Sequence, residues 1–179
     1  MVFAPHNEDP YEEKSSQLQK AFFSLLTKVL RKPGATFKDK HSDTFYLRSV
    51  TKSIISILVG IAIDQGYIKS IDDRVLDYSP QSYTQISDER WRNLKIEHLL
   101  TMKSGIPSIE SGGIALKMLL GNGDWVKFIL NLPLQCEPGE KFVYNSANTH
   151  LLSAIITNAT GMSTLDFAKR FLFAPLGIK

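Results

Sequence analysis

The sequence has 179 residues, about the size of one domain. Hydrophobic residues make up 43% of it and charged residues 22%, a globular composition that argues against a disordered or fibrous chain. The net charge of +3 is too small to indicate nucleic-acid binding, and the single cysteine, Cys136, excludes an intrachain disulfide framework and a cysteine-based zinc site.

Neither a membrane span nor an export signal is predicted. The longest nearly unbroken apolar run, 54–63, is much shorter than the ~20 residues that a membrane helix needs. Residues 1–10 lack the charged and then apolar layout of a signal peptide, so a cytoplasmic location is the default expectation. Residues 1–14 are polar and interrupted by proline, and we expect them to form a flexible N-terminal segment.

The first half of the chain contains two long helical patterns. Between 16 and 31, apolar residues recur at three- and four-residue spacings, which is typical of an amphipathic helix. Residues 35–47 are polar, with a weak strand signal over 44–47. The segment 49–66 is apolar on nearly every face and stops at a glycine, where helices often end. A helix that is apolar all round is a buried one, so we expect 49–66 to be the central helix.

Shorter elements are predicted downstream. They are a capped helical turn over 72–78, a short helix over 96–102, a helix after the glycine-rich loop 111–113, another that starts at 123–124 and runs to 132, an extended piece over 141–144, and two closing helices over 148–160 and 163–173. We expect Trp125 to be a core aromatic and His98 to pack or hydrogen-bond within a helix. The histidines show no metal-ligand spacing, so no metal site is predicted.

Ser49 and Lys52 form a Ser-x-x-Lys pair at the start of the helix expected over 49–66. Residues three apart share a helix face and side chains lean toward the N-terminus, so Lys52 leans toward the Ser49 hydroxyl. A serine hydroxyl is a weak nucleophile until a base takes its proton, and a neutral lysine can be that base. The amide of Ser49 is available as an oxyanion donor. The same residues also fit a simpler alternative, a helix N-cap followed by a solvated lysine.

Four segments in a fixed order place this pair in a wider context. They are Leu47-Arg48-Ser49-Val50-Thr51-Lys52-Ser53-Ile54, Ile96-Glu97-His98-Leu99-Leu100-Thr101-Met102-Lys103-Ser104-Gly105-Ile106, the turn Glu137-Pro138-Gly139-Glu140 leading to Phe142-Val143-Tyr144-Asn145-Ser146, and Phe173-Ala174-Pro175-Leu176-Gly177-Ile178. Together they resemble the beta-lactamase-related serine hydrolases: class C β-lactamases, DD-peptidases, and the esterases and amide hydrolases of the same fold. The resemblance covers about 43–179, most of the chain.

The resemblance implies a fold and a chemistry. The fold is the α+β fold of β-lactamases and DD-peptidases, of which this chain carries mostly the helical region, as one domain over 15–179. Ser49 maps to the acylated serine, Lys52 to the base, and Tyr144 to the tyrosine that relays the proton to the leaving group. The implied reaction cleaves an ester, an amide or a β-lactam in a small-molecule or peptide-like substrate through an acyl-enzyme on Ser49, with no cofactor.

Four further residues are expected to bind substrate by the same resemblance: Asn145, Ser146, Gly112 and Gly113. The family usually has asparagine two residues after the tyrosine, and this sequence has Ser146 there. A serine hydroxyl still forms hydrogen bonds, so the difference argues against strict β-lactam specificity more than against hydrolysis.

The family ends its fold with antiparallel strands that carry a Lys-Thr-Gly or His-x-Gly motif, and none follows Tyr144 before Lys179. The resemblance therefore predicts a C-terminally incomplete domain that hydrolyses poorly on its own, because losing one oxyanion donor typically costs ~10²–10³ in rate. The alternative is a catalytically inactive truncated homologue that acts as an interaction module or is a non-functional fragment. Whether the chain is active or not, the missing strands would expose the apolar faces of its first and last helices, a patch that should favour self-association or partial unfolding.

Overall fold

A computed structural model describes residues 47–79, 86, 88–110, 113–120 and 124–178. The helix expected over 16–31, the weak strand signal up to residue 46 and the loop residues 111–112 lie outside the described residues.

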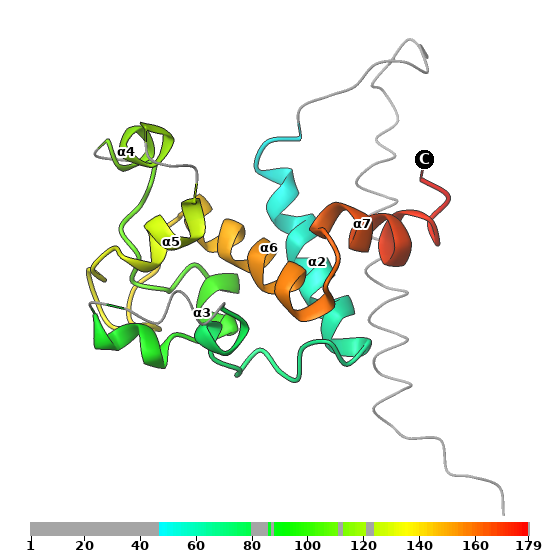
Figure 1. The fold of residues 1–179 in the computed structure, drawn as a ribbon, viewed down its shortest axis with the longest axis horizontal. Coiled ribbons are helices and arrows are strands. Elements are labelled where there is room, and N and C mark those ends of the chain that lie inside the picture. The colour runs from blue at the N-terminus through cyan, green and yellow to red at the C-terminus, as the bar shows by residue number, and fades with distance from the viewer. Residues whose placement is uncertain (1–46, 80–85, 87, 111–112, 121–123, 179) are drawn as a thin grey trace, which may run out of the picture. The chain divides into compact units, whose positions relative to one another are not determined.

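Helices dominate the described part of the chain (Figure 1). In chain order they are α2 (Val50–Asp64), η1 (Val75–Tyr78), η3 (Glu89–Asn93), α3 (Ile96–Leu100), α4 (Ile114–Leu120), α5 (Trp125–Leu130), α6 (Ser146–Thr160), α7 (Thr164–Ala168) and η4 (Lys169–Phe173). Both η1 and η3 are 3₁₀ turns, and η4 is a π turn that continues α7. Among the described residues, the β pairing consists of one isolated antiparallel bridge between Arg74 and Lys95. The strands of the expected α+β fold are therefore not represented there.

The core is centred on α2 and α6, which lie against each other in the middle of Figure 1. Each helix buries apolar side chains at three- and four-residue spacings: Ile55, Leu58, Val59 and Ala62 from α2, and Leu151, Leu152, Ile155 and Ile156 from α6. Burying one such leucine or isoleucine contributes roughly 1.5–3 kcal/mol, so this contact holds the two helix starts in a fixed relation.

The expectation that 49–66 is buried on every face is wrong. Only one face of α2 is buried, and Val50 is 60% exposed in its first turn. The boundaries are close to those predicted, because Gly66 adopts a left-handed φ of 74° just past the end of α2. A residue with a Cβ is strained in that conformation, which explains why the helix ends there.

Side-chain caps fix where several helices begin. The Asp124 carboxylate accepts from the backbone N–H of Lys127 at α5, and the Ser163 hydroxyl accepts from that of Asp166 at α7. Asn145 caps α6, which therefore starts two residues earlier than predicted. The 163–173 helix is present as α7 followed by η4, whereas η3, capped by Asp88, was not predicted.

The two tryptophans differ in burial. Trp91 has no exposed area, and its indole N–H donates to the Leu132 carbonyl at 3.0 Å. Trp125, expected in the core, is 36% exposed and lies against the His150 ring at 5.6 Å between centroids. The prediction for Trp125 is wrong because α5 buries Ile129 and Leu130 and leaves its first residue at the surface.

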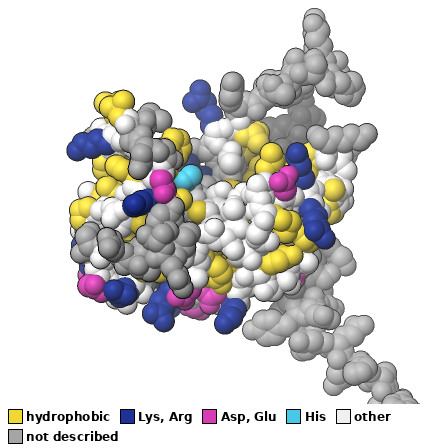
Figure 2. Space-filling view, viewed as in Figure 1, with side chains coloured by type: hydrophobic (Ala, Val, Ile, Leu, Met, Phe, Trp, Pro, Cys, Tyr) yellow, Lys and Arg dark blue, Asp and Glu magenta, His cyan; other side chains and the backbone are white. Residues whose placement is uncertain are grey.

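The surface of the described residues carries both basic and acidic side chains. Basic and acidic side chains alternate along the lower edge of the face drawn in Figure 2. Ion pairs such as Lys95 with Asp72, at 2.8 Å, join elements across this surface. No helix within the described residues has the length and apolar character that crossing a membrane requires.

Candidate active site

Ser49 lies at the start of α2, immediately before the first helical residue. Its backbone is already helical, with φ of −69° and ψ of −12°, and its side chain is exposed. The preceding residue, Arg48, has a φ of 45°, which is uncommon for a residue with a side chain. Such strain costs about 1 kcal/mol or more and is characteristic of functional sites. The turn presents the Ser49 hydroxyl at the N-terminal end of the helix.

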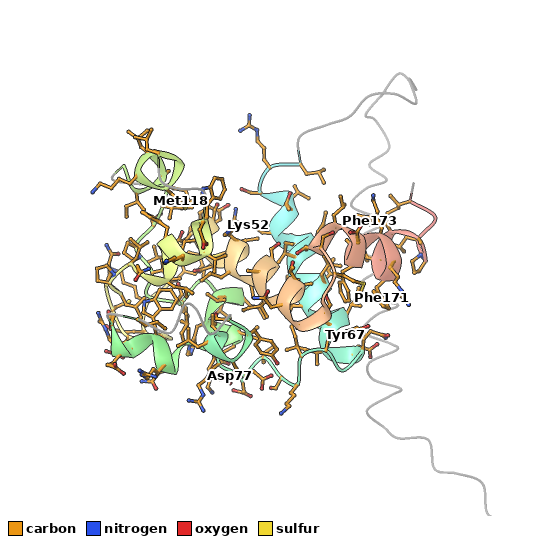
Figure 3. The ribbon with its side chains drawn as sticks, in the orientation of Figure 1. Lys52, Tyr67, Asp77, Met118, Phe171 and Phe173 are labelled. Atoms are coloured by element: carbon orange, nitrogen blue, oxygen red, sulfur yellow. The ribbon has the colours of Figure 1, made fainter. Side chains whose placement is uncertain are left out.

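Ser49, Lys52 and Tyr144 form a cluster of close polar contacts, called here the Ser49 cluster. The Tyr144 hydroxyl lies 2.7 Å from Ser49 Oγ. Lys52 Nζ donates to Ser49 Oγ at 3.4 Å and to Ser146 Oγ at 3.0 Å. The ammonium also lies 4.9 Å from the centroid of the Tyr144 ring. Lys52, labelled in Figure 3, thus reaches from α2 to the first turn of α6.

Asn145 fixes the backbone that carries Tyr144. Its side chain has no exposed area, and its amide donates to the carbonyls of Ile106 at 3.1 Å and Pro107 at 2.9 Å. Its Oδ1 accepts from the Ala147 N–H at 3.0 Å, which caps α6. The structure therefore gives Asn145 a structural position: all of these hydrogen bonds go to backbone groups of this chain, which leaves no exposed group for the expected contact with substrate.

A second buried tie joins the same loop to α6. The Ser104 hydroxyl donates to Asn148 Oδ1 at 2.7 Å and accepts from the Ile106 N–H at 3.2 Å. Both side chains are buried. Buried polar groups are costly unless they are hydrogen-bonded, so this pairing specifies one arrangement of the loop on the helix. Together with Asn145 it sets the position of Tyr144 opposite Ser49.

The charge of Lys52 acts on the tyrosine. The hydrogen bond from Lys52, together with the one from Ser49, holds the pKa of Tyr144 below its ordinary value of 10.0. Both bonds favour the phenolate, and the nearby positive charge adds to the effect. A phenol whose pKa is lowered in this way is ionised to a greater extent near neutral pH, so more of it is present as the phenolate that can accept a proton.

Glu110 is a neighbour of the cluster that sequence reasoning missed. Its Oε1 accepts from the Ser146 N–H at 2.7 Å and its Oε2 from the Ser108 hydroxyl at 3.0 Å. Its negative charge acts to raise the pKa of Tyr144, against the effect of Lys52. No motif marks Glu110, because it reaches the site only when its loop folds onto a helix 36 residues further along.

The remaining predicted residues have different outcomes. Ser146 lies in the cluster as an acceptor for Lys52, whereas Gly112 is outside the described residues. Gly113 is exposed just before α4, with a φ of 73°, and its role in substrate binding stays a prediction. His98 hydrogen-bonds as expected, with its Nδ1 accepting from the Lys95 N–H at 3.2 Å. Burial lowers the pKa of His98.

The family model named Beta-lactamase matches residues 40–179. Penicillin-binding protein 4* of Bacillus subtilis is 28% identical over 144 residues, which are 78% of this chain and 30% of that protein. The Beta-lactamase of Escherichia coli is 26% identical over 135 residues, 74% of this chain and 33% of that protein. The chain thus spans about a third of the length of these curated relatives.

Solved structures include proteins whose fold is similar to that of this chain. The crystal structure of a D-stereospecific amidohydrolase from Streptomyces sp. superposes with a TM-score of 0.61. The match covers 72% of this chain and 41% of that one at 20% identity, so it is a likeness of fold alone. The described helices correspond to part of that fold.

Proposed function

Because the chain belongs to the beta-lactamase family, a family of serine hydrolases, we propose that it forms an acyl-enzyme on Ser49 and transfers the acyl group to water. The observation that carries the proposal is the 2.7 Å contact between Ser49 Oγ and the Tyr144 hydroxyl, with Lys52 Nζ within 3.4 Å of the same oxygen. A nucleophile with a proton acceptor in hydrogen-bond reach is the geometry that covalent catalysis requires.

In the proposed reaction, Ser49 Oγ attacks the carbonyl carbon of an ester, an amide or a β-lactam. Lys52, in its neutral amine form, takes the proton of the hydroxyl and becomes an ammonium, and the new C–O bond leaves a negative charge on the carbonyl oxygen as its C=O π bond opens. That oxyanion accepts a hydrogen bond from the Ser49 N–H, which donates to no other group among the hydrogen bonds of the described residues.

Tyr144 then donates its phenolic proton to the leaving group and takes up the proton that Lys52 received, as the bond from the carbonyl carbon to the leaving group breaks. Its lowered pKa supports this role, since a relay must both accept and donate near neutral pH. Water attacks the ester on Ser49 in the second half of the reaction, loses a proton to the same groups and regenerates the free hydroxyl. Ser146 would hold the Lys52 ammonium through the 3.0 Å contact.

The first test is covalent labelling of Ser49. The 179-residue chain is incubated with a fluorophosphonate, and the mass of the intact protein is measured. We expect one adduct per chain, lost in Ser49→Ala and retained in Ser56→Ala, a matched change at an exposed serine of the same helix. An adduct that persists in Ser49→Ala would refute the assignment of the nucleophile.

The alternative is an inactive homologue that acts through its surface. Apolar side chains beside Ser49 favour it, since Leu47 is 51% and Val50 60% exposed. Under this alternative, wild-type protein with a helical circular dichroism spectrum takes no fluorophosphonate label, and sedimentation shows self-association that polar substitution of Val50 reduces.

A further inference from the structure

Glu110 places a negative charge at the edge of the Ser49 cluster. One carboxylate oxygen accepts from the Ser146 N–H and the other from the Ser108 hydroxyl, so a hydrogen bond holds each oxygen in place. Ser146 is also the residue whose hydroxyl accepts from Lys52. The Glu110 side chain is exposed, so the anchored carboxylate faces solvent as well as the cluster.

The carboxylate is ionised at neutral pH. Burial alone would raise the pKa of Glu110, but hydrogen bonds from Ser146 and Ser108 outweigh that effect and hold the pKa below the ordinary value of 4.5. Within the described residues Glu110 forms no ion pair with any Lys, Arg or His within 4.0 Å. The site therefore holds a fixed anion that has no cationic partner in the described part of the chain.

Acyl transfer does not account for this charge, and the start of α6 accounts for it only in part. Asn145 already caps α6 through the Ala147 N–H, and a neutral amide at position 110 would still accept from the Ser146 N–H, although as a weaker hydrogen bond. The charge acts to raise the pKa of Tyr144, which works against the phenolate that the proposed reaction uses. An exposed carboxylate that opposes the chemistry of Tyr144 and has no cationic partner among the described residues is available to bind a cationic group of the substrate.

We infer that Glu110 selects substrates that carry a cationic group, such as an ammonium, close to the scissile ester or amide bond. The inference rests on the proposed function, because it takes Ser49 as the reacting centre. A cation bound beside Glu110 gains Coulomb energy that a neutral substrate lacks, and Lys52 would repel the same cation from its own side of the cluster. The anion thus both attracts and orients a charged substrate.

The test compares two esters of the same shape, p-nitrophenyl 3-aminopropanoate and p-nitrophenyl butanoate, which differ by an ammonium in place of a methyl group. The rate of acylation is followed by the burst of p-nitrophenolate and by the mass of the acylated protein. We expect Glu110→Gln, which keeps an oxygen for the Ser146 N–H, to reduce the ratio of the cationic to the neutral rate about five- to tenfold. Because the wild type and Glu110→Gln react with the same two esters, the intrinsic reactivities of the esters cancel when the two rate ratios are compared.

Glu89→Gln is the matched control, because it removes the same charge from an exposed glutamate that bonds to Arg92 in η3. This variant should leave the ratio as in the wild type. A second measurement does not depend on the fold of any variant: raising the salt concentration from about 20 mM to about 500 mM should lower the wild-type ratio, because salt screens exposed charges.

The outcomes separate the two proposals. If Glu110 only supports the helix, Glu110→Gln lowers both rates by one factor and the ratio stays the same, which overturns the inference. A wild-type ratio that does not respond to salt overturns it as well. If neither ester acylates wild-type protein, the proposed function fails and the inference fails with it. If both esters acylate Ser49 but the ratio of their rates is the same in wild type and Glu110→Gln, only the inference fails.

Discussion

The hydroxyls of Ser49 and Tyr144 lie 2.7 Å apart, although 95 residues separate them in the chain. The contact exists because α2 and α6 pack against each other, with Ser49 directly before α2 and Tyr144 two residues before α6. Lys52 is one turn along α2 from Ser49, so the helix geometry brings the third group into reach. The geometry of the site is thus a consequence of how one pair of helices packs.

Removal of the phenolic oxygen is expected to slow acylation. Tyr144→Phe keeps the ring beside Lys52 and loses the contacts of the hydroxyl with Ser49 and Lys52. Since a positioned acid or base contributes ~10²–10⁴ in rate, acylation by p-nitrophenyl butanoate should fall at least about a hundredfold. Phe142→Leu, a change at another exposed aromatic of the same loop, is the control and should retain the wild-type rate. Equal rates in wild type and Tyr144→Phe would contradict the relay.

The titration of Tyr144 should depend on its charged neighbour. Lys52 lowers the pKa of Tyr144, so the phenolate forms at a lower pH than in free tyrosine. Replacing Lys52 with methionine removes the favourable charge, and the pKa of Tyr144 should rise toward 10.0. Ultraviolet difference spectra against Tyr144→Phe measure the phenolate directly, and an unshifted titration would contradict the coupling.

Much of the helical layout could be predicted from the sequence. The apolar spacing in α2 and α6, the left-handed glycine after α2, and the capping residues Asp124 and Ser163 are local signals, and each marks a boundary within a few residues of the one observed. These features depend on backbone sterics and on neighbours within one helical turn.

The features that the sequence did not reveal depend on contacts between distant segments. The carboxylate of Glu110 meets α6 only through the fold of its loop, and the burial of Trp91 rather than Trp125 depends on which element covers each indole. Ser49 and Lys52 could be singled out by their helix spacing, whereas Tyr144 could be named only by resemblance. Spacing accounts for the nearness of Ser49 and Lys52, but nothing local places Tyr144 beside them.

Asn145 should prove to be a determinant of stability. Asn145→Ala leaves the buried carbonyls of Ile106 and Pro107 without their donor and removes the cap of α6. An unpaired buried polar group costs ~1–3 kcal/mol and a lost cap ~1 kcal/mol, so the free energy of unfolding should fall by about 3 kcal/mol in urea titrations.

The matched control for that substitution is Asn131→Ala. Its amide donates to the Lys127 carbonyl at the exposed end of α5, so its loss should cost less than about 1 kcal/mol. If Asn145→Ala unfolds at the wild-type urea concentration but binds substrate poorly, the residue contacts substrate and the structural role is refuted.

Asp88 should make stability depend on pH. It accepts hydrogen bonds from Arg90 and from the Leu134 N–H, and these hold the pKa of its carboxyl far below the ordinary 3.8, although burial opposes the effect. A carboxyl whose pKa is lower in the folded than in the unfolded state adds stability above its unfolded value. That stability is lost as pH falls toward the folded value.

Asp88→Asn should therefore unfold more easily than wild type at pH 7, by roughly 1–3 kcal/mol, because charged hydrogen bonds are replaced by neutral ones. The difference should narrow as the pH falls below about 4, since the wild type then loses what the variant already lacks. Urea titrations at a series of pH values measure the gap. A gap that stays constant down to pH 2 would mean that the carboxylate charge contributes nothing, and that Asp88 acts only as a hydrogen-bond acceptor that asparagine replaces poorly.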